Sequence, residues 1–131
     1  MELIADTTLL IGMWRSQPWA RSYMTQNSGK AIGIPWVVFG EFWHGAIIAN
    51  HDPEQVRRFL TLGLALLDPV PVISTYAEMC TRLQAKKNYG VIGQNDLWIA
   101  ATALAFDKPL ITRNRRHFDK IEGLKIEILA E

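Results

Sequence analysis

Three acidic side chains occupy positions in this sequence from which carboxylates could bind a metal ion. Asp6 directly follows a short apolar run, Glu41 lies inside an apolar stretch, and Asp96 lies at the start of an alanine-rich stretch. Carboxylates that converge without a cation repel one another, so a divalent ion is a natural partner for such a set. Oxygen ligands suit Mg²⁺ or Mn²⁺, whereas zinc prefers nitrogen and sulfur ligands. An ion held there could activate water for attack on a phosphate ester.

Each of these acids also has a purely structural explanation. Asp6 precedes two threonines and could cap a helix, and the two interpretations of Asp6 stay open. Asp96 could complement a helix dipole from the first turn, which is the better explanation when its segment is taken alone. A glutamate such as Glu41 usually lies on a solvated helix face. Its apolar neighbours instead predict a helix covered on all sides, in which a carboxylate needs a partner or a metal.

Polar and basic residues follow another apolar run near the end of the chain. Asn114 comes just after Leu110 to Thr112. The arginines around it could hold phosphate groups bidentately, and we expect them to bind phosphates without reading sequence; they are Arg113, Arg115 and Arg116.

Short apolar runs alternate with helical patterns five times, which is typical of a parallel α/β sheet with helices on both faces. The expected strands are residues 2–5, 31–35, 70–73, 110–112 and 126–129. Because the carboxyl ends of parallel strands lie on one edge, Asp6 and Asn114 should share that edge. Asp96 joins them only if its helix starts close to the same edge. Glu41 lies about two turns into its helix but can reach back toward the helix N-terminus.

Two helices in the middle of the chain have clear start signals. Asp52 and Pro53 begin one that is expected to run to residue 67, and its apolar residues suggest a structural element or a dimer surface. Residues 75–78 match a capping box for a helix that reaches Lys87. Its basic end could contact RNA, although basic residues late in a helix usually complement the helix dipole.

The global properties are those of one globular domain. The chain has 131 residues, of which 49% are hydrophobic and 21% charged, and its formal net charge is +1. That charge indicates no bulk attraction to a polyanion. The single cysteine, Cys80, excludes an internal disulfide and a cysteine-based zinc site, and suggests a buried thiol. Because neither a signal peptide nor a membrane-spanning stretch is evident, we expect a cytoplasmic protein with no membrane partner.

Four short motifs occur in an order and spacing that resemble those of the PIN-domain ribonucleases, and within them the VapC-like toxins of bacterial toxin–antitoxin pairs. The motifs are Leu3 to Thr7, Glu41 with Gly45, Ile92 to Ala101 around Asp96, and Ile111 to Phe118. The resemblance covers residues 1–131 as a single PIN-like domain. It implies a three-layer α/β sandwich, with a central parallel sheet of about four or five strands flanked by helices. The implied activity is Mg²⁺-dependent endoribonuclease cleavage, with Mn²⁺ as a possible substitute.

The resemblance also implies a role for each candidate residue. Asp6 and Asp96 match the metal ligands, and Glu41 matches the third acid. Many relatives carry a fourth acid where this chain has Asn114, and His117 and Asp119 are the other candidates for that role. The implied partners are RNA, a second copy of the chain, and a cognate antitoxin that lays an apolar helix along the first helices and a charged group into the metal site. Four tryptophans in the first third of the chain suggest apolar surface left for such partners.

Two other functions compete with the nuclease. One is a receiver-like phospho-acceptor regulatory domain, which also has acids at strand ends and a late Lys-Pro pair such as Lys108–Pro109. However, no adjacent acidic pair follows the first apolar run, and Lys108 precedes its strand. The other is a catalytically silent PIN-fold binding module, for which the uncharged Asn114 is the only indication.

Overall fold

Five short parallel strands form the centre of the structure, a computed structural model that describes residues 1–129. The sheet order is β3-β2-β1-β4-β5, so the first strand of the chain is the middle one. Ile4 of β1 pairs with Gly33 on one side and with Leu110 on the other. The bounds are β1 (Leu3–Ala5), β2 (Ile32–Pro35), β3 (Leu64–Leu66), β4 (Leu110–Thr112) and β5 (Ile126–Ile128).

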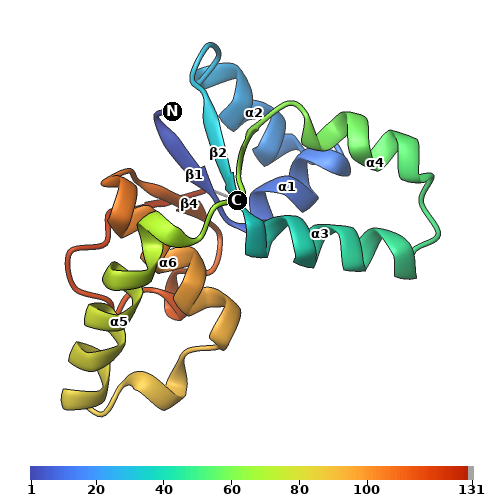
Figure 1. Ribbon diagram of the computed structural model, residues 1–131. Helices are drawn as coiled ribbons and strands as arrows, with labels where there is room; N and C mark the ends of the chain where they lie inside the picture. Colours follow the sequence, from blue (N-terminus) through green and yellow to red (C-terminus); the bar gives the residue numbers. More distant parts are fainter. Residues whose placement is uncertain (130–131) are drawn as a thin grey trace.

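Six α-helices flank this sheet in two layers (Figure 1). Right-handed crossovers place α1 to α4 on one face, and they place α5 and α6, which connect β3 back to β4, on the other. Two 3₁₀ turns complete the elements. The bounds are α1 (Thr7–Trp14), α2 (Pro18–Gln26), α3 (Trp36–Ile48), α4 (Pro53–Leu60), α5 (Val70–Ala85), η1 (Tyr89–Val91), α6 (Gln94–Phe106) and η2 (Arg115–His117). The predicted three-layer α/β fold with a parallel sheet is confirmed.

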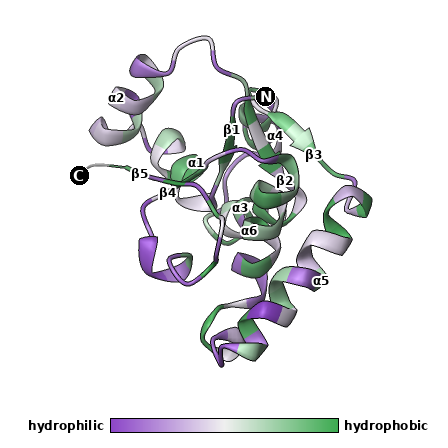
Figure 2. Cartoon of the chain, turned by 90° about the vertical axis from the view of Figure 1, so that its left-hand side faces the viewer, coloured by the Kyte–Doolittle hydropathy of each residue, from purple (hydrophilic) through white to green (hydrophobic). Residues whose placement is uncertain are grey.

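The core lies between the sheet and these helices. Every residue of β1 and β4 is buried, and hydrophobic segments gather at the centre of the molecule (Figure 2). In α6 the small side chains of Ala100 and Ala101 are buried together with Leu97 and Ile99. Because alanines protrude little, α6 packs closely against its neighbours. Across residues 1–129, no helix combines the length and apolar character that crossing a membrane requires.

The largest error of the sequence interpretation falls between residues 60 and 78. The helix that begins at Pro53 ends at Leu60 rather than at residue 67, and the next strand is β3 (Leu64–Leu66). Residues 70–73, predicted as a strand, form the first turn of α5. Prolines 69 and 71 fit there because first-turn residues need no intrahelical N–H bond. The capping box predicted at residues 75–78 is wrong as well, since those residues lie inside α5.

Two predicted apolar surfaces also differ from the structure. α3 is not covered on all sides, because it buries Val38, Phe42 and Ala46 while His44 and Ile47 are exposed. α4 is amphipathic, with two buried residues and charged residues outward, so it is not the apolar surface expected of it. The four tryptophans in the first third of the chain were expected to leave apolar surface exposed. They are instead half-buried against the core, at positions 14, 19, 36 and 43.

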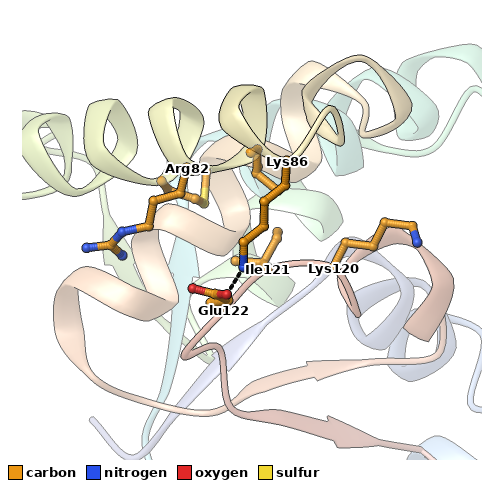
Figure 3. Close-up of a pocket in the computed structure, with 7 residues that line it drawn as sticks. Arg82, Lys86, Lys120, Ile121 and Glu122 are labelled. Carbon is orange, nitrogen blue, oxygen red and sulfur yellow. Dashed lines mark ion pairs between the residues drawn. The ribbon is translucent and has the colours of Figure 1, made fainter.

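The basic end of α5 takes part in a structural contact. Arg82 and Lys86 line a cavity of about 10 Å³, roughly the space of one water molecule, between α5 and the segment before β5 (Figure 3). Lys86 pairs with Glu122 across this cavity. Cys80, on the same helix, is a buried free thiol, as expected.

Candidate active site

The candidate site lies at the point where the chain stops adding strands on one side of β1 and begins to add them on the other side. From β1 the chain first builds β2 and β3 on one side, and later returns to place β4 on the other side. In open α/β sheets, ligands bind at the carboxyl ends of the strands at such a switch point. Asp6 follows β1 directly, and Arg113 and Asn114 follow β4. The predicted shared edge of Asp6 and Asn114 is therefore confirmed.

Asp6 is buried, with 4% of its surface exposed, and its carboxylate accepts three hydrogen bonds. Oδ1 accepts from the Thr7 backbone N–H at 2.7 Å, so Asp6 is indeed the N-cap of α1. Oδ2 accepts from Thr112 Oγ1 at 2.6 Å and from Thr8 Oγ1 at 3.2 Å. Burial raises the pKa of Asp6 despite these hydrogen bonds, and the charge of Glu41 raises it further. The N-cap hydrogen bond uses Oδ1, whereas both side-chain hydroxyls donate to Oδ2.

Glu41 is oriented by residues next to both other acids. Its Oε1 accepts a hydrogen bond from Thr7 Oγ1 at 2.6 Å, and its Oε2 accepts one from Asn95 Nδ2 at 3.3 Å. Thr7 adjoins Asp6, and Asn95 adjoins Asp96. These two bonds turn Glu41, from the second turn of α3, toward the edge that carries the other carboxylates.

Asp96 lies in the first turn of α6, and aromatic side chains from other helices hold that turn. The Trp98 ring stacks on Tyr76 of α5 with centroids 3.6 Å apart, and Trp36 of α3 packs on Trp98 at 5.5 Å. Gln94 Nε2 donates to the Tyr76 hydroxyl at 2.6 Å. This packing fixes the start of α6 at the edge where Asp6 and Glu41 lie.

The charge of Asp96 interacts with the other two acids. Burial is the main cause that raises the pKa of the Asp96 carboxyl, followed by the charge of Asp6; Glu41 adds to this and His117 opposes it. His117 Nδ1 lies 2.9 Å from Asp96 Oδ2. The three acids therefore share one region of negative potential, as the sequence predicted.

The candidates for the fourth-acid position lie in different places. The Asn114 backbone N–H donates to Thr112 Oγ1 at 2.9 Å, one hydrogen bond away from Asp6, and the residue lines an open cavity beside Thr8. His117, in η2, is the one that contacts an acid directly. Asp119 is exposed. In this structure, then, Asn114 and His117 approach the acids, and neither brings a further negative charge.

The three arginines divide into two groups. Arg115 and Arg116 are exposed on η2. Arg113 is half-buried, and its guanidinium lies over the Trp19 ring with 4.3 Å between Cζ and the ring centroid. Its backbone N–H donates to Thr8 Oγ1 at 3.3 Å.

Sequence reasoning missed the hydroxyl and amide groups that hold the acids in place. Thr8 and Thr112 bind Asp6, while Thr7 and Asn95 bind Glu41. One signal was available, because each of these residues is within two positions of a strand end or of a predicted acid. Which acid each would contact depends on strand register and helix placement, which the sequence pattern did not give.

The acids suit an ion that keeps part of its hydration shell. Within residues 1–129 no group of three His, Cys, Asp or Glu side chains is arranged closely enough to hold a metal by itself. The buried Asp6 and the half-buried Asp96 nevertheless both have raised pKa values and repel each other, and a cation would relieve that repulsion. Mg²⁺ commonly binds through one or two carboxylates plus waters, so Asp6 and Asp96 fit it.

Comparison with known proteins places this geometry in a family. The family model described as "PIN domain" matches residues 3–124. A protein named ribonuclease VapC1 from Methanocaldococcus jannaschii is 31% identical over 128 residues, covering 95% of this chain and 86% of that protein. A Rickettsia felis protein, also named ribonuclease VapC1, is 27% identical over 132 residues, covering 96% and 95%.

Solved structures agree on the fold. A DNA-bound VapBC structure from Salmonella typhimurium aligns with a TM-score of 0.82 at 21% identity, covering 98% of both chains. VapBC-1 from nontypeable Haemophilus influenzae aligns with a TM-score of 0.79 at 23% identity and the same coverage. The chain belongs to the PIN-domain family and, within it, to the VapC ribonucleases.

Proposed function

We propose that this protein cleaves RNA as a Mg²⁺-dependent endoribonuclease, with Asp6, Glu41, Asp96 and Asn114 at the catalytic centre. The observation that carries the proposal is the convergence of three acids at the switch point of the sheet, two of them with raised pKa values. Relatives named ribonucleases support RNA as the substrate.

The residues have distinct roles in this proposal. Asp6 and Asp96 hold the ion, which when bound supplies an activated water and offsets charge on the phosphate. Thr112 and Thr8 keep Asp6 in one orientation by donating to its Oδ2. Glu41, fixed at both oxygens by Thr7 and Asn95, orients the attacking water or accepts its proton.

The outer residues bind and orient the RNA. Asn114, which lines the cavity beside the acids, can donate or accept a hydrogen bond at the phosphate or at a water. Arg115 and Arg116 are exposed on η2 near the site and contact phosphates. His117 holds Asp96 in place through its Nδ1 contact.

The geometry favours the nuclease over both rivals. The receiver-like alternative requires its late lysine at the edge of the sheet that carries the acids. Lys108 precedes β4 and therefore lies at the opposite edge of the sheet. A silent binding module would have no need for a glutamate oriented at both oxygens toward two other acids.

Matched substitutions at the two ends of α6 test the proposal. Asp96→Asn should lower the cleavage rate of a labelled RNA in Mg²⁺ by ~10³-fold or more, because a metal ligand is lost. Asp107→Asn makes the same chemical change at the other end of the helix, where Asn suits the left-handed backbone, with φ of 52°. This variant should keep nearly full activity.

A chelator should abolish cleavage by the wild-type protein, and Mn²⁺ should restore it. Undiminished cleavage by folded Asp96→Asn protein would rule out the assigned site. A phosphorylated protein after incubation with a small phosphodonor, together with no RNA cleavage in Mg²⁺, would support the receiver-like alternative instead.

We also propose two protein partners, a second copy of the chain and an antitoxin. A solved neighbour from Klebsiella pneumoniae is a toxin–antitoxin complex by its title, which supports an antitoxin partner. In this chain, β3 is an edge strand, and exposed apolar side chains extend from just before it into α5; they are Leu62, Leu64, Leu67, Val70 and Ile73, here named the β3–α5 patch. A large exposed apolar patch marks an interface, and the β3–α5 patch is our proposed dimer surface.

The antitoxin is proposed to bind along the first helices. A groove of about 110 Å³ lies between α1 and α3, lined by apolar residues such as Trp14 and Phe42 and also by Glu41. An apolar helix in this groove could extend an Arg or Lys to Glu41 and the neighbouring acids. Such a group would compete with the ion for the carboxylates.

A further inference from the structure

An open cavity of about 440 Å³ lies beside the acids on the outer side of α1. Thr8 and Asn114 belong to its lining, and both are linked to Asp6: Thr8 donates to Asp6 directly, while Asn114 donates to the Thr112 hydroxyl that donates to Asp6. The volume lies within the range of about 300–1,000 Å³ that is usual for ligand sites. Whatever occupies the cavity therefore lies next to the proposed centre of cleavage.

The wall of this cavity is built around the Trp19 indole. Gly12 of α1 makes room for the ring, because a Cβ at that position would overlap with the six-membered part of the indole. Trp19 Nε1 donates to Gln17 Oε1 at 2.6 Å. The indole is thus fixed along one edge by packing and at its N–H by a hydrogen bond.

Trp19 in turn holds Arg113. The Arg113 guanidinium lies over the indole at 4.3 Å from the ring centroid, and its backbone is tied to Thr8. A guanidinium that lies on an aromatic ring is a planar, oriented cation. Because Arg113 and Trp19 both line the cavity, a guanidinium held over an indole borders the ligand space beside the acids.

We propose that this cavity binds one unpaired nucleobase of the RNA, stacked on Arg113. The proposal rests on the proposed ribonuclease function and extends it, because it gives Arg113 a contact to a base in place of a phosphate. Unpaired bases stack on aromatic side chains and on arginine planes in RNA-binding proteins. The Gln17 amide, whose oxygen is occupied by Trp19, offers its NH₂ group to an acceptor on the base edge. The site therefore selects RNA that is single-stranded beside the cleaved bond.

Abasic substitution scanning tests this proposal. The probes are short single-stranded RNAs in which one nucleotide at a time lacks its base while every phosphate remains. Binding is measured by fluorescence anisotropy in chelator, so that no cleavage occurs and the result is independent of the metal. At one position, loss of the base should weaken binding by roughly 5- to 150-fold, the size of one base–aromatic stack.

Arg113→Lys should remove this penalty at that one position, because lysine keeps the positive charge but has no plane to stack. Its salt dependence of binding should stay unchanged for the same reason. Arg58→Lys, the same replacement at an exposed arginine on α4, should keep the full penalty. Trp19→Phe, which keeps a smaller ring over Gly12, should reduce the penalty and serves as a second variant.

Two results would overturn the base site: an equal penalty at every abasic position, or a full penalty retained in folded Arg113→Lys protein. Failure of any RNA to bind would overturn it too, and would point to a protein segment as the occupant of the cavity. Cleavage in Mg²⁺ is assayed separately. If cleavage is present but no single base matters, the base site fails while the nuclease function stands.

Discussion

At the scale of single residues, the most consequential feature is the burial of the Asp6 carboxylate. Three hydrogen bonds stabilise its charge, but burial outweighs them and its pKa is raised. A carboxyl group whose pKa is raised in the folded state lowers the free energy of unfolding once it ionises. The site is therefore expected to cost the protein stability when no cation is bound.

Asp6→Asn should be more stable than the wild-type protein at pH 7 in chelator. The folded protein holds the Asp6 proton at pH values where the unfolded chain, with a pKa near 3.8, has lost it. The free energy of unfolding of the wild type therefore falls as the pH rises from about 3.8 through the raised folded pKa, and stays lowered above it. Asn removes this dependence and still caps α1. Urea denaturation of both proteins should show a stability gap at pH 7 that closes below about pH 3.8.

Adding Mg²⁺ supplies the control for this prediction. A ligand that binds only the folded state raises stability, so Mg²⁺ should stabilise the wild type and leave Asp6→Asn unchanged. Equal stability of the two proteins at pH 7 in chelator would show that burial of Asp6 carries no net cost.

The sequence identified the acids because each acid has a recognisable local context. Asp6 follows an apolar run and Asp96 opens an alanine-rich helix, and both contexts survive in the structure. The contact of His117 with Asp96 and the stack of Arg113 on Trp19 could not be predicted in this way. They join segments that are distant in the chain, and no spacing rule connects such pairs.

At the scale of elements, sequence patterns succeeded where a periodic segment had clear ends, and failed around β3. Strand β3 is three residues long and partly exposed, so its apolar residues are indistinguishable from an extension of α4. The start of α5 is rich in Val, Ile and Pro, which favours a strand by local propensity, yet tertiary packing makes it helical. Asp6, Glu41 and Asp96 all lie outside this segment, so the error did not affect them.

Glycines in α1 and α3 provide a matched test of how α1 and α2 pack. Gly12→Ala should destabilise the protein by about 1–3 kcal/mol, because the new methyl group overlaps with Trp19 and forces it to move. Gly40→Ala, on an exposed part of α3 with nothing within 4 Å of the new Cβ, should stabilise it by about 0.5–1 kcal/mol. Urea midpoints report both changes. A Gly12→Ala protein as stable as the wild type would mean that Trp19 is not confined as described.

At the scale of the whole molecule, the β3–α5 patch is exposed on one edge of the sheet. Several of its side chains are more than half exposed, such as Leu62 at 74% and Val70 at 70%. Edge strands with apolar side chains are usually covered by a partner or protected by charges. The apolar side chains of this patch are therefore expected to be buried in an assembly.

Light scattering at micromolar concentration should therefore show a dimer, and Leu64→Asp should convert it to a monomer. Val91→Asp is the matched control, since Val91 is also an exposed apolar residue but lies on η1, beyond the other end of α5. A wild-type protein that is monomeric under these conditions would contradict the assignment of the patch. A dimer that persists in Leu64→Asp would place the interface elsewhere.

Inhibition by the cognate antitoxin should weaken as the Mg²⁺ concentration rises. The reason is that the ion and an antitoxin Arg or Lys would use the same carboxylates. The measurement is the antitoxin concentration that halves RNA cleavage at several Mg²⁺ concentrations. A constant value would mean that the antitoxin blocks the site without entering it.

The hydrogen bond from Thr112 to Asp6 joins residues 106 positions apart, and this separation has a consequence during synthesis on the ribosome. At ~5–20 residues per second, Thr112 is added roughly 5 to 20 seconds after Asp6. A nascent chain that ends before β4 lacks one of the two strands that pair with β1. It also lacks the Thr112 hydroxyl that orients Asp6. A growing polypeptide therefore lacks an oriented Asp6 carboxylate at the proposed site until β4 has been synthesised.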